Sequence, residues 1–381
     1  YRVWVSRVIL QHTRVSVGEG YFARFMARFP TLEALAVARE EAVLWLWQGL
    51  GYYSRGRRLL EGARHVLREF EGRMPSEPSE LLKVPGIGPY SAGAIASIAH
   101  GVRAPLVDGN VIRVLTRVFG LAGDPLKKDL QRKLWMLADE LVPADVPGEF
   151  NQALMELGAL VCTPRSPTCL TCPWRKLCVA HAEGNPERYP EKVEKERSTE
   201  VTVLVLVLEH RARLAFETLP SNARWWAGMT ALPSIELGER TSGALSRDWA
   251  QHASSVSTLL DASRTASKPS KSKKGEVDAL PSERSLFDVT KEILASRDVA
   301  VDSKIDLKLL GPLRHQVTRF KITLLPVHVR LEGERPDLPG HVWVSRRELA
   351  EAALPAPHRK LVGALVAESR PTRGKSRSSA S

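Results

Sequence analysis

The sequence predicts an all-α domain followed by a smaller α+β domain. Three observations predict this arrangement. Apolar residues recur at helical spacing from Arg2 to Leu160. The run VTVLVLVLEH from Val201 and the run from Phe320 to Leu331 are typical of strands. The length of 381 residues, 43% of them hydrophobic, exceeds an ordinary single domain and provides a core for each of two.

The helices of the first domain follow one another with short connections. They are expected at Arg2 to Val17, Tyr21 to Phe29, Leu32 to Ala38, Glu41 to Gln48 and within Leu50 to Phe70, with two more from Leu126 to Leu160 around a loop at Pro143 to Gly148. Tyr52 and Tyr53 lie beside Arg55, Arg57 and Arg58, a composition that suits DNA binding. The alternative is that both tyrosines pack between helices.

A tight turn made by Pro85, Gly86, Gly88 and Pro89 lies within the stretch from Leu82 to Val114. Glycine adopts backbone dihedrals that other residues rarely adopt, and it lets an anion approach the bare amides. Ser91 to Ala99 then reads as a small-residue helix. A helix N-terminus behind a glycine-rich turn predicts a phosphate site.

Asp108 is a lone carboxylate just before a second apolar helix, Val111 to Phe119. It is followed by Gly109 and Asn110, so it stands where that helix begins. An Asp in this position is a candidate catalytic carboxylate. The alternative is a plain helix N-cap, which is a common role for Asp.

All four cysteines of the chain lie in one short segment, CTPRSPTCLTCPWRKLC. Cys162, Cys169, Cys172 and Cys178 are separated by six, two and five residues. A group this compact predicts a common centre. For four thiolates that are not expected to form disulfides, a structural zinc ion is the general alternative.

The net charge of +12 favours an anionic partner such as DNA. Part of this charge lies in the segment from Ser263 to Lys274 and in the tail 369–381, both expected to be disordered. No apolar run is long enough to predict a membrane span. The chain starts at Tyr1 in what reads as the middle of a domain, so a preceding N-terminal piece is expected.

The hairpin, the aspartate one helix later and the cysteine segment together resemble the helix-hairpin-helix DNA glycosylases. The resemblance implies an all-α glycosylase domain over residues 1–182, in which Pro85, Gly86 and Gly88 grip a DNA phosphate. It also implies that the four cysteines hold a [4Fe–4S] cluster in the loop 162–178. The role expected of this cluster is structural and electrostatic, with Arg165, Arg175 and Lys176 presented to phosphates.

Enzymes of this superfamily must extrude a base to reach its glycosidic bond. By resemblance, Tyr52 belongs to the group that inserts near the opposite base, and Gln11 belongs to the wedge that fills the vacated space. Bifunctional relatives of the endonuclease III type form a Schiff base through a lysine at the position of Tyr90. A phenol cannot form an imine, so the chain is expected to be monofunctional. Tyr90 is expected to hydrogen-bond Asp108 or the sugar, or only to pack.

Residues 183–200 read as a charged linker, and residues 201–368 resemble the Nudix-like C-terminal domain of adenine DNA glycosylases. Further expectations are a hairpin strand at Leu214 to Leu219, a strand at His341 to Val344, a helix at Arg347 to Val366 and a disordered insertion at about 241–284. The family recognises 8-oxoguanine through a Phe-Ser-His loop. Here Val317, Thr318 and Arg319 stand in its place, so Thr318 keeps a hydroxyl but the aromatic wedge is absent. The sequence lacks the glutamate-rich Nudix box.

The resemblance to adenine-specific mismatch glycosylases implies two carboxylates, because adenine leaves poorly until its N7 is protonated. Asp108 matches the carboxylate that stabilises the sugar cation, with Asn110 beside it in the catalytic group. The acid is a glutamate in the family pattern Trp-x-Ser-Glu, but here Trp4-Val5-Ser6 is followed by Arg7. A guanidinium does not give up its proton. Glu156 matches another family carboxylate and is expected to help position water.

The implied function is base excision repair, in which adenine mispaired with 8-oxoguanine or guanine is removed, with catalytic competence left open by Arg7. Two alternatives stay open. A thymine or uracil mismatch glycosylase would release its base as an anion that Arg7 can stabilise. A non-catalytic lesion-binding protein would need only the DNA grip. The expected partner is double-stranded DNA with a mismatched or oxidised base, bound by a monomer in the cytoplasm, or at the nucleoid of a bacterium.

Overall fold

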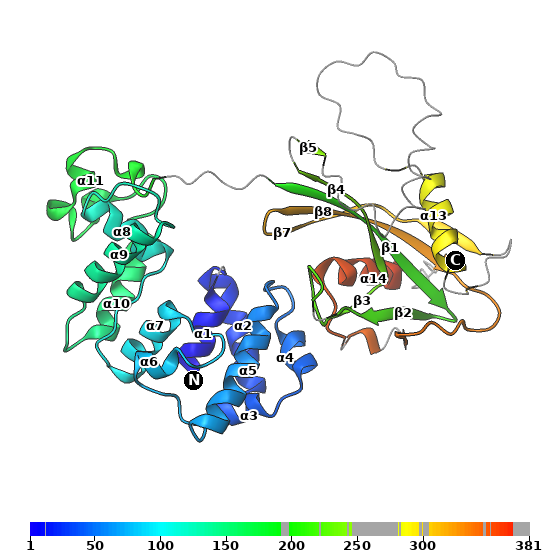
Figure 1. The fold of residues 1–381 in the computed structure, drawn as a ribbon, viewed down its shortest axis with the longest axis horizontal. Coiled ribbons are helices and arrows are strands. Elements are labelled where there is room, and N and C mark those ends of the chain that lie inside the picture. The colour runs from blue at the N-terminus through cyan, green and yellow to red at the C-terminus, as the bar shows by residue number, and fades with distance from the viewer. Residues whose placement is uncertain are drawn as a thin grey trace, which may run out of the picture. The chain divides into compact units, whose positions relative to one another are not determined.

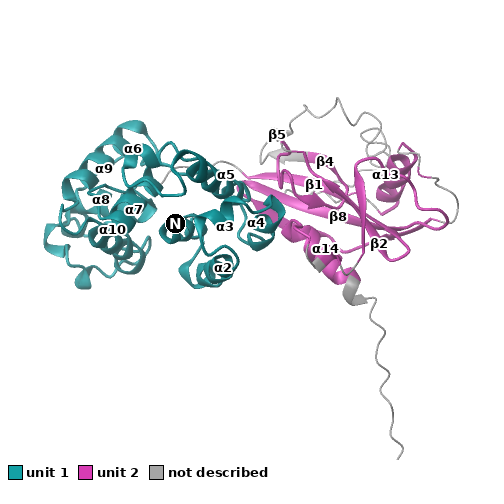
Figure 2. Cartoon of the chain, turned by 90° about the horizontal axis from the view of Figure 1, so that it is seen from below, with its two compact units in different colours: residues 1–195 teal, residues 196–381 magenta. Residues whose placement is uncertain are grey.

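The computed structural model of the protein divides into two compact units, residues 1–195 and 196–381 (Figure 2). The boundary falls inside the predicted linker 183–200. The structure describes residues 1–11, 13–191, 198–220, 222–241, 244–245, 281, 283–296, 299, 305–345, 348–350 and 352–368. The predicted tail 369–381 and nearly all of the predicted insertion lie outside the described residues.

The first unit is all-α, as predicted (Figure 1). Its α-helices are α1 (Arg2–Leu10), α2 (Val15–Arg28), α3 (Leu32–Ala36), α4 (Glu40–Leu46), α5 (Ser54–Glu69), α6 (Pro78–Leu81), α7 (Pro89–His100), α8 (Gly109–Val118), α9 (Lys128–Leu141), α10 (Pro147–Glu156) and α11 (Val179–Ala182). A π-helical turn, η1 (Leu157–Val161), extends α10, and short 3-10 turns lie at η2 (Cys169–Thr171), η3 (Arg175–Leu177) and η4 (Pro186–Arg188).

The prediction of one helix from Arg2 to Val17 is wrong, because α1 ends at Leu10 and α2 begins at Val15. The chain turns back there, and Gly18 of α2 packs on the end of α1. A Cβ added at Gly18 would lie 2.6 Å from Cδ2 of Leu10. Apolar periodicity continues through this bend without a proline or glycine at the break, so the sequence pattern could not reveal it.

Trp4 anchors the first unit. It is fully buried, and its ring lies against Gly62 of α5. A Cβ at Gly62 would lie 2.7 Å from the Trp4 ring and 2.5 Å from the carbonyl oxygen of Pro85, so only glycine lets α1, α5 and the hairpin meet. Helix α7 is buried over most of its length, and its Gly93 allows similarly close approach of the backbone at Pro105.

The segment 183–190, predicted as linker, packs on the first unit. Tyr189 is 4% exposed, and its carbonyl oxygen accepts a hydrogen bond of 3.0 Å from Nε of Arg117. A charged composition with a proline therefore hides an ordered contact, which the buried side chain of Tyr189 and its carbonyl oxygen both make.

The second unit is α+β, as predicted (Figure 1). Its strands are β1 (Thr199–His210), β2 (Arg213–Thr218), β3 (Thr230–Ala231), β4 (Ser234–Thr241), β5 (Ala244–Leu245), β6 (Asp306–Leu309), β7 (Leu313–Val317), β8 (Phe320–Arg330) and β9 (His341–Ser345). Its helices are α13 (Glu283–Ala295) and α14 (Ala356–Glu368), with a 3-10 turn, η5 (Glu348–Ala350). Strand β1 pairs in parallel with β8 and antiparallel with β2 and β4.

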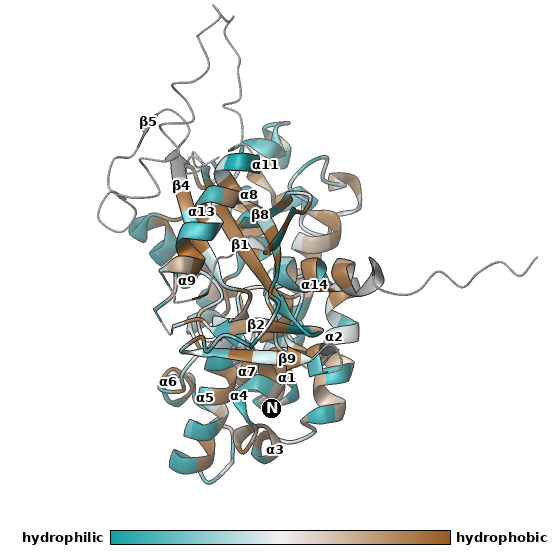
Figure 3. Ribbon diagram, turned by 90° about the vertical axis from the view of Figure 1, so that its right-hand side faces the viewer, coloured by the Kyte–Doolittle hydropathy of each residue, from teal (hydrophilic) through white to brown (hydrophobic). Residues whose placement is uncertain are grey.

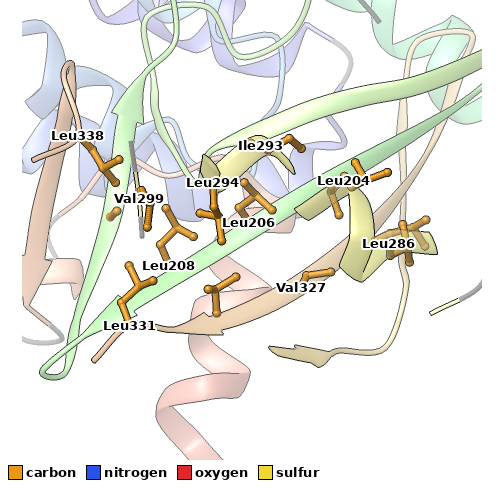
Figure 4. Packing of buried hydrophobic residues seen from close by; sticks show 14 of the residues in the cluster. Leu204, Leu206, Leu208, Leu286, Ile293, Leu294, Val299, Val327, Leu331 and Leu338 are labelled. Carbon is orange, nitrogen blue, oxygen red and sulfur yellow. The ribbon is translucent and has the colours of Figure 1, made fainter. Parts of the chain in front are cut away.

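Strand β1 is buried on both faces, which explains its nearly continuous apolar sequence and its brown colour in Figure 3. Leu204, Leu206 and Leu208 point to the core that α13 covers (Figure 4). The alternate valines of β1 lie in the second core, with Leu361 of α14. The Nudix-like assignment of this unit stays a prediction.

The predicted helix from Arg347 to Val366 begins late, at Ala356. Pro355 explains the delay, because the residue before a proline avoids helical dihedrals and the proline itself has no N–H to donate. Helix α13 was missed, since it begins at the edge of the low-complexity stretch. Among the described residues no helix is both long and apolar enough to cross a membrane.

We expect the second unit to lose stability as the pH falls from about 6.5 towards 3. His358 is buried, its Nδ1 accepts the N–H of Leu232 at 3.0 Å, and burial lowers its pKa to about 3. The unfolded chain binds this proton near pH 6.5 while the folded chain does not, so folding is penalised by about 1.4 kcal/mol per pH unit within this window. The contribution is fully present above pH 6.5.

Thermal or urea unfolding of the full chain at pH 7 and pH 4.5 checks this expectation. In His358→Asn the amide oxygen keeps an acceptor for Leu232 but does not titrate, so the pH dependence should become shallower. An equal pH dependence in both proteins would contradict the assignment.

Candidate active site and cysteine pocket

Asp108 is the N-cap of α8, and the cap fixes its carboxylate. Oδ1 accepts the N–H groups of Asn110 at 2.9 Å and Val111 at 2.8 Å, and Oδ2 accepts Nδ2 of Asn110 at 3.1 Å. The side chain is half-buried. The positive end of the helix stabilises its negative charge. The N-cap alternative is therefore correct as structure, and it is compatible with a chemical role, because the cap holds the carboxylate in one orientation.

Arg7 and Tyr90 lie in the same site, contributed by the last turn of α1 and the first turn of α7. Nη1 of Arg7 lies 3.6 Å from Sδ of Met155, and the Tyr90 hydroxyl lies 3.5 Å from the same sulfur. Burial raises the pKa of Tyr90, whereas a hydrogen bond and the charge of Arg7 lower it and the charge of Asp108 raises it. The site thus combines a carboxylate, a phenol and a guanidinium.

Glu156 does not join these groups. It is exposed at the end of α10, and the contacts from α10 to Arg7 and Tyr90 come from its neighbour Met155, which is 8% exposed. Successive helix residues point in different directions, and Met155 is the one that points to Arg7 and Tyr90. Met155 is not among the predicted site residues, because a thioether does not titrate. No sequence signal marks it, because the burial of Asn151 one turn earlier is a property of the structure.

Arg113 connects the Asp108 site to the cysteine segment. Its Nη2 donates to Oδ1 of Asn110 at 2.8 Å and to the carbonyl oxygen of Gly158 at 2.6 Å, and its Nε donates to the carbonyl oxygen of Cys162 at 2.7 Å. Burial lowers the pKa of Arg113, and the nearby charges of Cys162 and Asp108 counteract this. Asn110 is thereby held between Asp108 and the half-buried Arg113.

The four cysteines line one pocket, together with apolar side chains that include Val114 and Leu157. Arg117 is buried beside them, and its Nη1 donates to Sγ of Cys162 at 3.3 Å and to the carbonyl oxygen of Thr163 at 2.7 Å. Burial, followed by the charges of the other three cysteines, raises the pKa of Cys169. A pocket that combines four thiols with a nearby buried cation suits a metal ion or an iron–sulfur cluster that thiolates hold.

The hairpin presents its backbone to solvent. Gly86 has φ of 83°, and a Cβ there would lie 2.8 Å from Cβ of Arg58, so the turn requires glycine. Gly88 is exposed and caps α7, and a Cβ there would meet no atom within 4 Å. Pro85 is half-buried. The hairpin therefore leaves an open helix N-terminus beside the exposed Arg58.

Gln11 and Tyr52 lie on two segments that Arg55 connects. Gln11 caps the end of α1, and its carbonyl oxygen accepts a hydrogen bond from Arg55. The ring of Tyr52 lies 5.6 Å from Cζ of Arg55 and is 48% exposed. Tyr53 is 8% exposed, so the packing alternative holds for Tyr53 and not for Tyr52.

Thr318 occupies the turn between β7 and β8 in the second unit. It is exposed with φ of 52°, which is uncommon for a β-branched residue. Its hydroxyl donates to the carbonyl oxygen of Val317 at 2.7 Å. The neighbouring Phe320 does not project freely, because its ring packs 5.7 Å from that of Trp225 and lies 4.2 Å from Cζ of Arg224.

Comparison with known proteins matches residues 5–140 to the HhH-GPD superfamily of base excision DNA repair proteins. The adenine DNA glycosylase of Buchnera aphidicola subsp. Schizaphis graminum is 34% identical over 241 residues, which cover 63% of this chain and 69% of that protein. The chain belongs to the adenine DNA glycosylase family. The all-α unit and the α+β unit that follows it stand in the predicted order along the chain.

Relatives from animals match a shorter stretch. The adenine DNA glycosylase of Rattus norvegicus is 53% identical over 182 residues, which are 48% of this chain and 35% of that protein. The chain thus spans about a third of the length of this relative. A solved structure of a thermostable thymine-DNA glycosylase is 29% identical, covers 48% of this chain and 84% of its own, and superposes with a TM-score of 0.44.

Proposed function

We propose that the protein hydrolyses the N-glycosidic bond of adenine paired with 8-oxoguanine or guanine in double-stranded DNA. The observation that carries this proposal is the carboxylate of Asp108, which backbone amides and Asn110 hold in one orientation next to Tyr90. Membership of the adenine DNA glycosylase family supports the choice of base.

Asp108 would stabilise the positive charge that develops on the deoxyribose as the bond to the base breaks, and would orient the attacking water. Tyr90 has no amine, so no covalent imine forms at that position, and the abasic strand should stay intact. Asn110 would keep Asp108 oriented, since it is itself held by Arg113.

Arg7 disfavours the excision of adenine at this site. It occupies the place where the family has its acid, and a guanidinium cannot protonate N7 of adenine. Its positive charge also opposes the developing sugar cation. We therefore propose that adenine excision by the natural chain is slow.

The same arginine favours a second candidate, the removal of thymine or uracil from mispairs with guanine. A pyrimidine leaves as an anion, and Arg7 and Tyr90 provide donors that would stabilise it. The third candidate is lesion binding without catalysis, for which the hairpin would suffice.

Single-turnover glycosylase assays on duplexes with A:8-oxoguanine, A:G, T:G and U:G distinguish these candidates. Excision confined to the two adenine duplexes would support the proposal, and excision confined to T:G and U:G would replace it with the second candidate. Binding without excision of any base would favour the third. A covalent complex of protein and DNA trapped by borohydride would contradict a monofunctional enzyme.

The residues of the cysteine pocket fit a [4Fe–4S] cluster, which we propose Cys162, Cys169, Cys172 and Cys178 hold. Four thiols line one pocket with apolar walls, and Arg117 donates to the sulfur of Cys162. Such a cluster would order the loop and thereby the carbonyl oxygens that accept from Arg113 and Arg117. Among the described residues no three Cys, His, Asp or Glu side chains are grouped so that they could hold a metal ion. The proposal of a cluster is therefore supported by the pocket that the four cysteines share.

The purified protein should be brown and absorb at roughly 400 nm, with iron and sulfide bound. Cys172→Ala should lose the colour and weaken DNA binding, whereas Leu170→Ala, an exposed position in the same loop, should keep both. Metal analysis that finds zinc without iron would refute the cluster.

Gly88→Asp should weaken binding to every duplex by a similar factor, at least about tenfold, because it places a negative charge where a phosphate is expected. Gly88→Ala is the matched control. The site has ordinary extended dihedrals and free space for a Cβ, so both variants should fold. Titrations at several salt concentrations measure the effect, and a loss confined to one mismatch would argue against a phosphate grip.

For the second unit we propose that lesion recognition differs from the family pattern. Thr318 provides a hydroxyl group, but no aromatic ring stands in the place of the family's phenylalanine. The packing of Phe320 against Trp225 and Arg224 supports this, since that ring is already engaged. Action as a monomer in the cytoplasm stays a prediction.

A further inference from the structure

The guanidinium of Arg55, in the first turn of α5, connects two segments that are far apart in the sequence. Its Nη1 donates to the carbonyl oxygen of Val8 at 2.8 Å and to that of Gln11. Its Nη2 donates to the carbonyl oxygens of Leu50 at 3.4 Å and Gly51 at 3.5 Å. One side chain therefore fixes the end of α1 to the turn before α5.

The same guanidinium also supports Tyr52. Its Cζ lies 5.6 Å from the centroid of the Tyr52 ring and 5.7 Å from that of Trp47. Tyr52 has φ of 47°, a left-handed conformation that persists only when its surroundings impose it. Trp47 adds to the constraint, because its Nε1 donates to the carbonyl oxygen of Gly51 at 3.2 Å. The exposed ring of Tyr52 thus lies against the half-buried Arg55, which itself packs on the buried Trp47.

We propose that Arg55 is a positioning residue for base extrusion, which makes the segments of Gln11 and Tyr52 a single rigid unit that enters the duplex. The inference rests on the proposed glycosylase function. Two segments that move independently would yield when they push into stacked bases, whereas a unit joined through four backbone carbonyls resists. Arg55 itself lies beneath the two segments, and it acts through them rather than by contact with the base.

Arg64 provides a matched control on the same helix. It also donates to backbone carbonyl oxygens of another segment, those of Ala36 at 3.1 Å and Ala38 at 2.8 Å, near the end of α3. Arg55→Met and Arg64→Met therefore remove the same kind of contact from α5. Arg55→Lys keeps the charge and some donors, but loses the planar fork.

The test uses the full chain and a duplex with 2-aminopurine opposite 8-oxoguanine, whose fluorescence rises when the base leaves the stack. Arg55→Met should abolish most of the rise at saturating protein and slow single-turnover excision of adenine by about 10²-fold, with little change in Kd. Arg64→Met should match the wild type in both, and Arg55→Lys should recover part of the loss. In the free protein, hydrogen exchange should increase in residues 8–11 and 49–52 of Arg55→Met together.

The inference is overturned if Arg55→Met and Arg64→Met reduce the fluorescence rise equally, if Arg55→Met leaves it intact, or if the wild type does not raise the fluorescence at all. A wild type that extrudes the base but excises none would refute the proposed hydrolysis and leave the role of Arg55 standing.

Discussion

Arg7→Glu should raise single-turnover excision of adenine opposite 8-oxoguanine by at least about 10²-fold. The substitution places a carboxylic acid beside Tyr90 and Met155, where N7 of an extruded adenine needs a proton, and general acid catalysis is typically worth about 10²- to 10⁴-fold. It also removes a cation from a site in which positive charge develops on the sugar. Arg7 is half-buried and contacts Met155 through its terminal nitrogen, so the shorter glutamate fits without displacing the sulfur.

Arg7→Gln separates these two effects, because it removes the cation without supplying an acid. We expect Arg7→Gln to change adenine excision far less than Arg7→Glu, and both variants to reduce any T:G activity. If Arg7→Glu leaves adenine excision near zero, another part of the pocket is incompetent, and the lesion-binding candidate becomes the better one.

Asp108→Asn should lower excision at least about 10²-fold and leave duplex affinity unchanged, because only the developing sugar cation requires the negative charge. Asparagine is as good an N-cap as aspartate, so the hydrogen bonds to the amides of Asn110 and Val111 should persist and the stability of α8 should hold. The comparison is made in the Arg7→Glu background, which gives a measurable rate to lose.

Asp108→Ala distinguishes chemistry from capping. It should also remove excision, but it should lower the free energy of unfolding by about 1 kcal/mol, since the cap is lost. Turnover in Asp108→Asn equal to that of its parent would leave Asp108 as a cap alone. Rates at saturating enzyme and urea unfolding of the two variants provide both measurements.

The parts of the site that the sequence revealed are local. The glycine hairpin, the aspartate at a helix start and the cysteine spacing each lie within a short run of residues, and their backbone requirements restrict the residue types. Gly86 illustrates this, because its φ of 83° and its contact with Arg58 admit no side chain. The helix break at Leu10 was harder, because apolar periodicity continues across it, whereas Pro355 marks the late start of α14 in the sequence itself.

The contacts of the site that the sequence does not predict are those between distant segments. Met155 meets Arg7 across 148 positions of sequence, and Arg113 reaches Cys162 across 49. Glu156 is predicted as a site residue because it matches a family carboxylate, whereas nothing in the sequence singles out Met155. Which of two adjacent helix residues faces a site depends on how the helix packs.

The sequence by itself determined the chemical inventory of this protein: a glycine-rich hairpin, one aspartate at a helix start, four thiols in one loop and an arginine in place of the expected acid. Only the tertiary structure decided how these groups are held. Arg113 and Arg117 hold the cysteine loop mainly through backbone carbonyl oxygens, and Arg55 joins the end of α1 to the turn before α5 in the same way. Every residue carries a carbonyl oxygen, so such bonds leave no trace in the choice of the accepting residue, and they exist only once folding has brought the segments together.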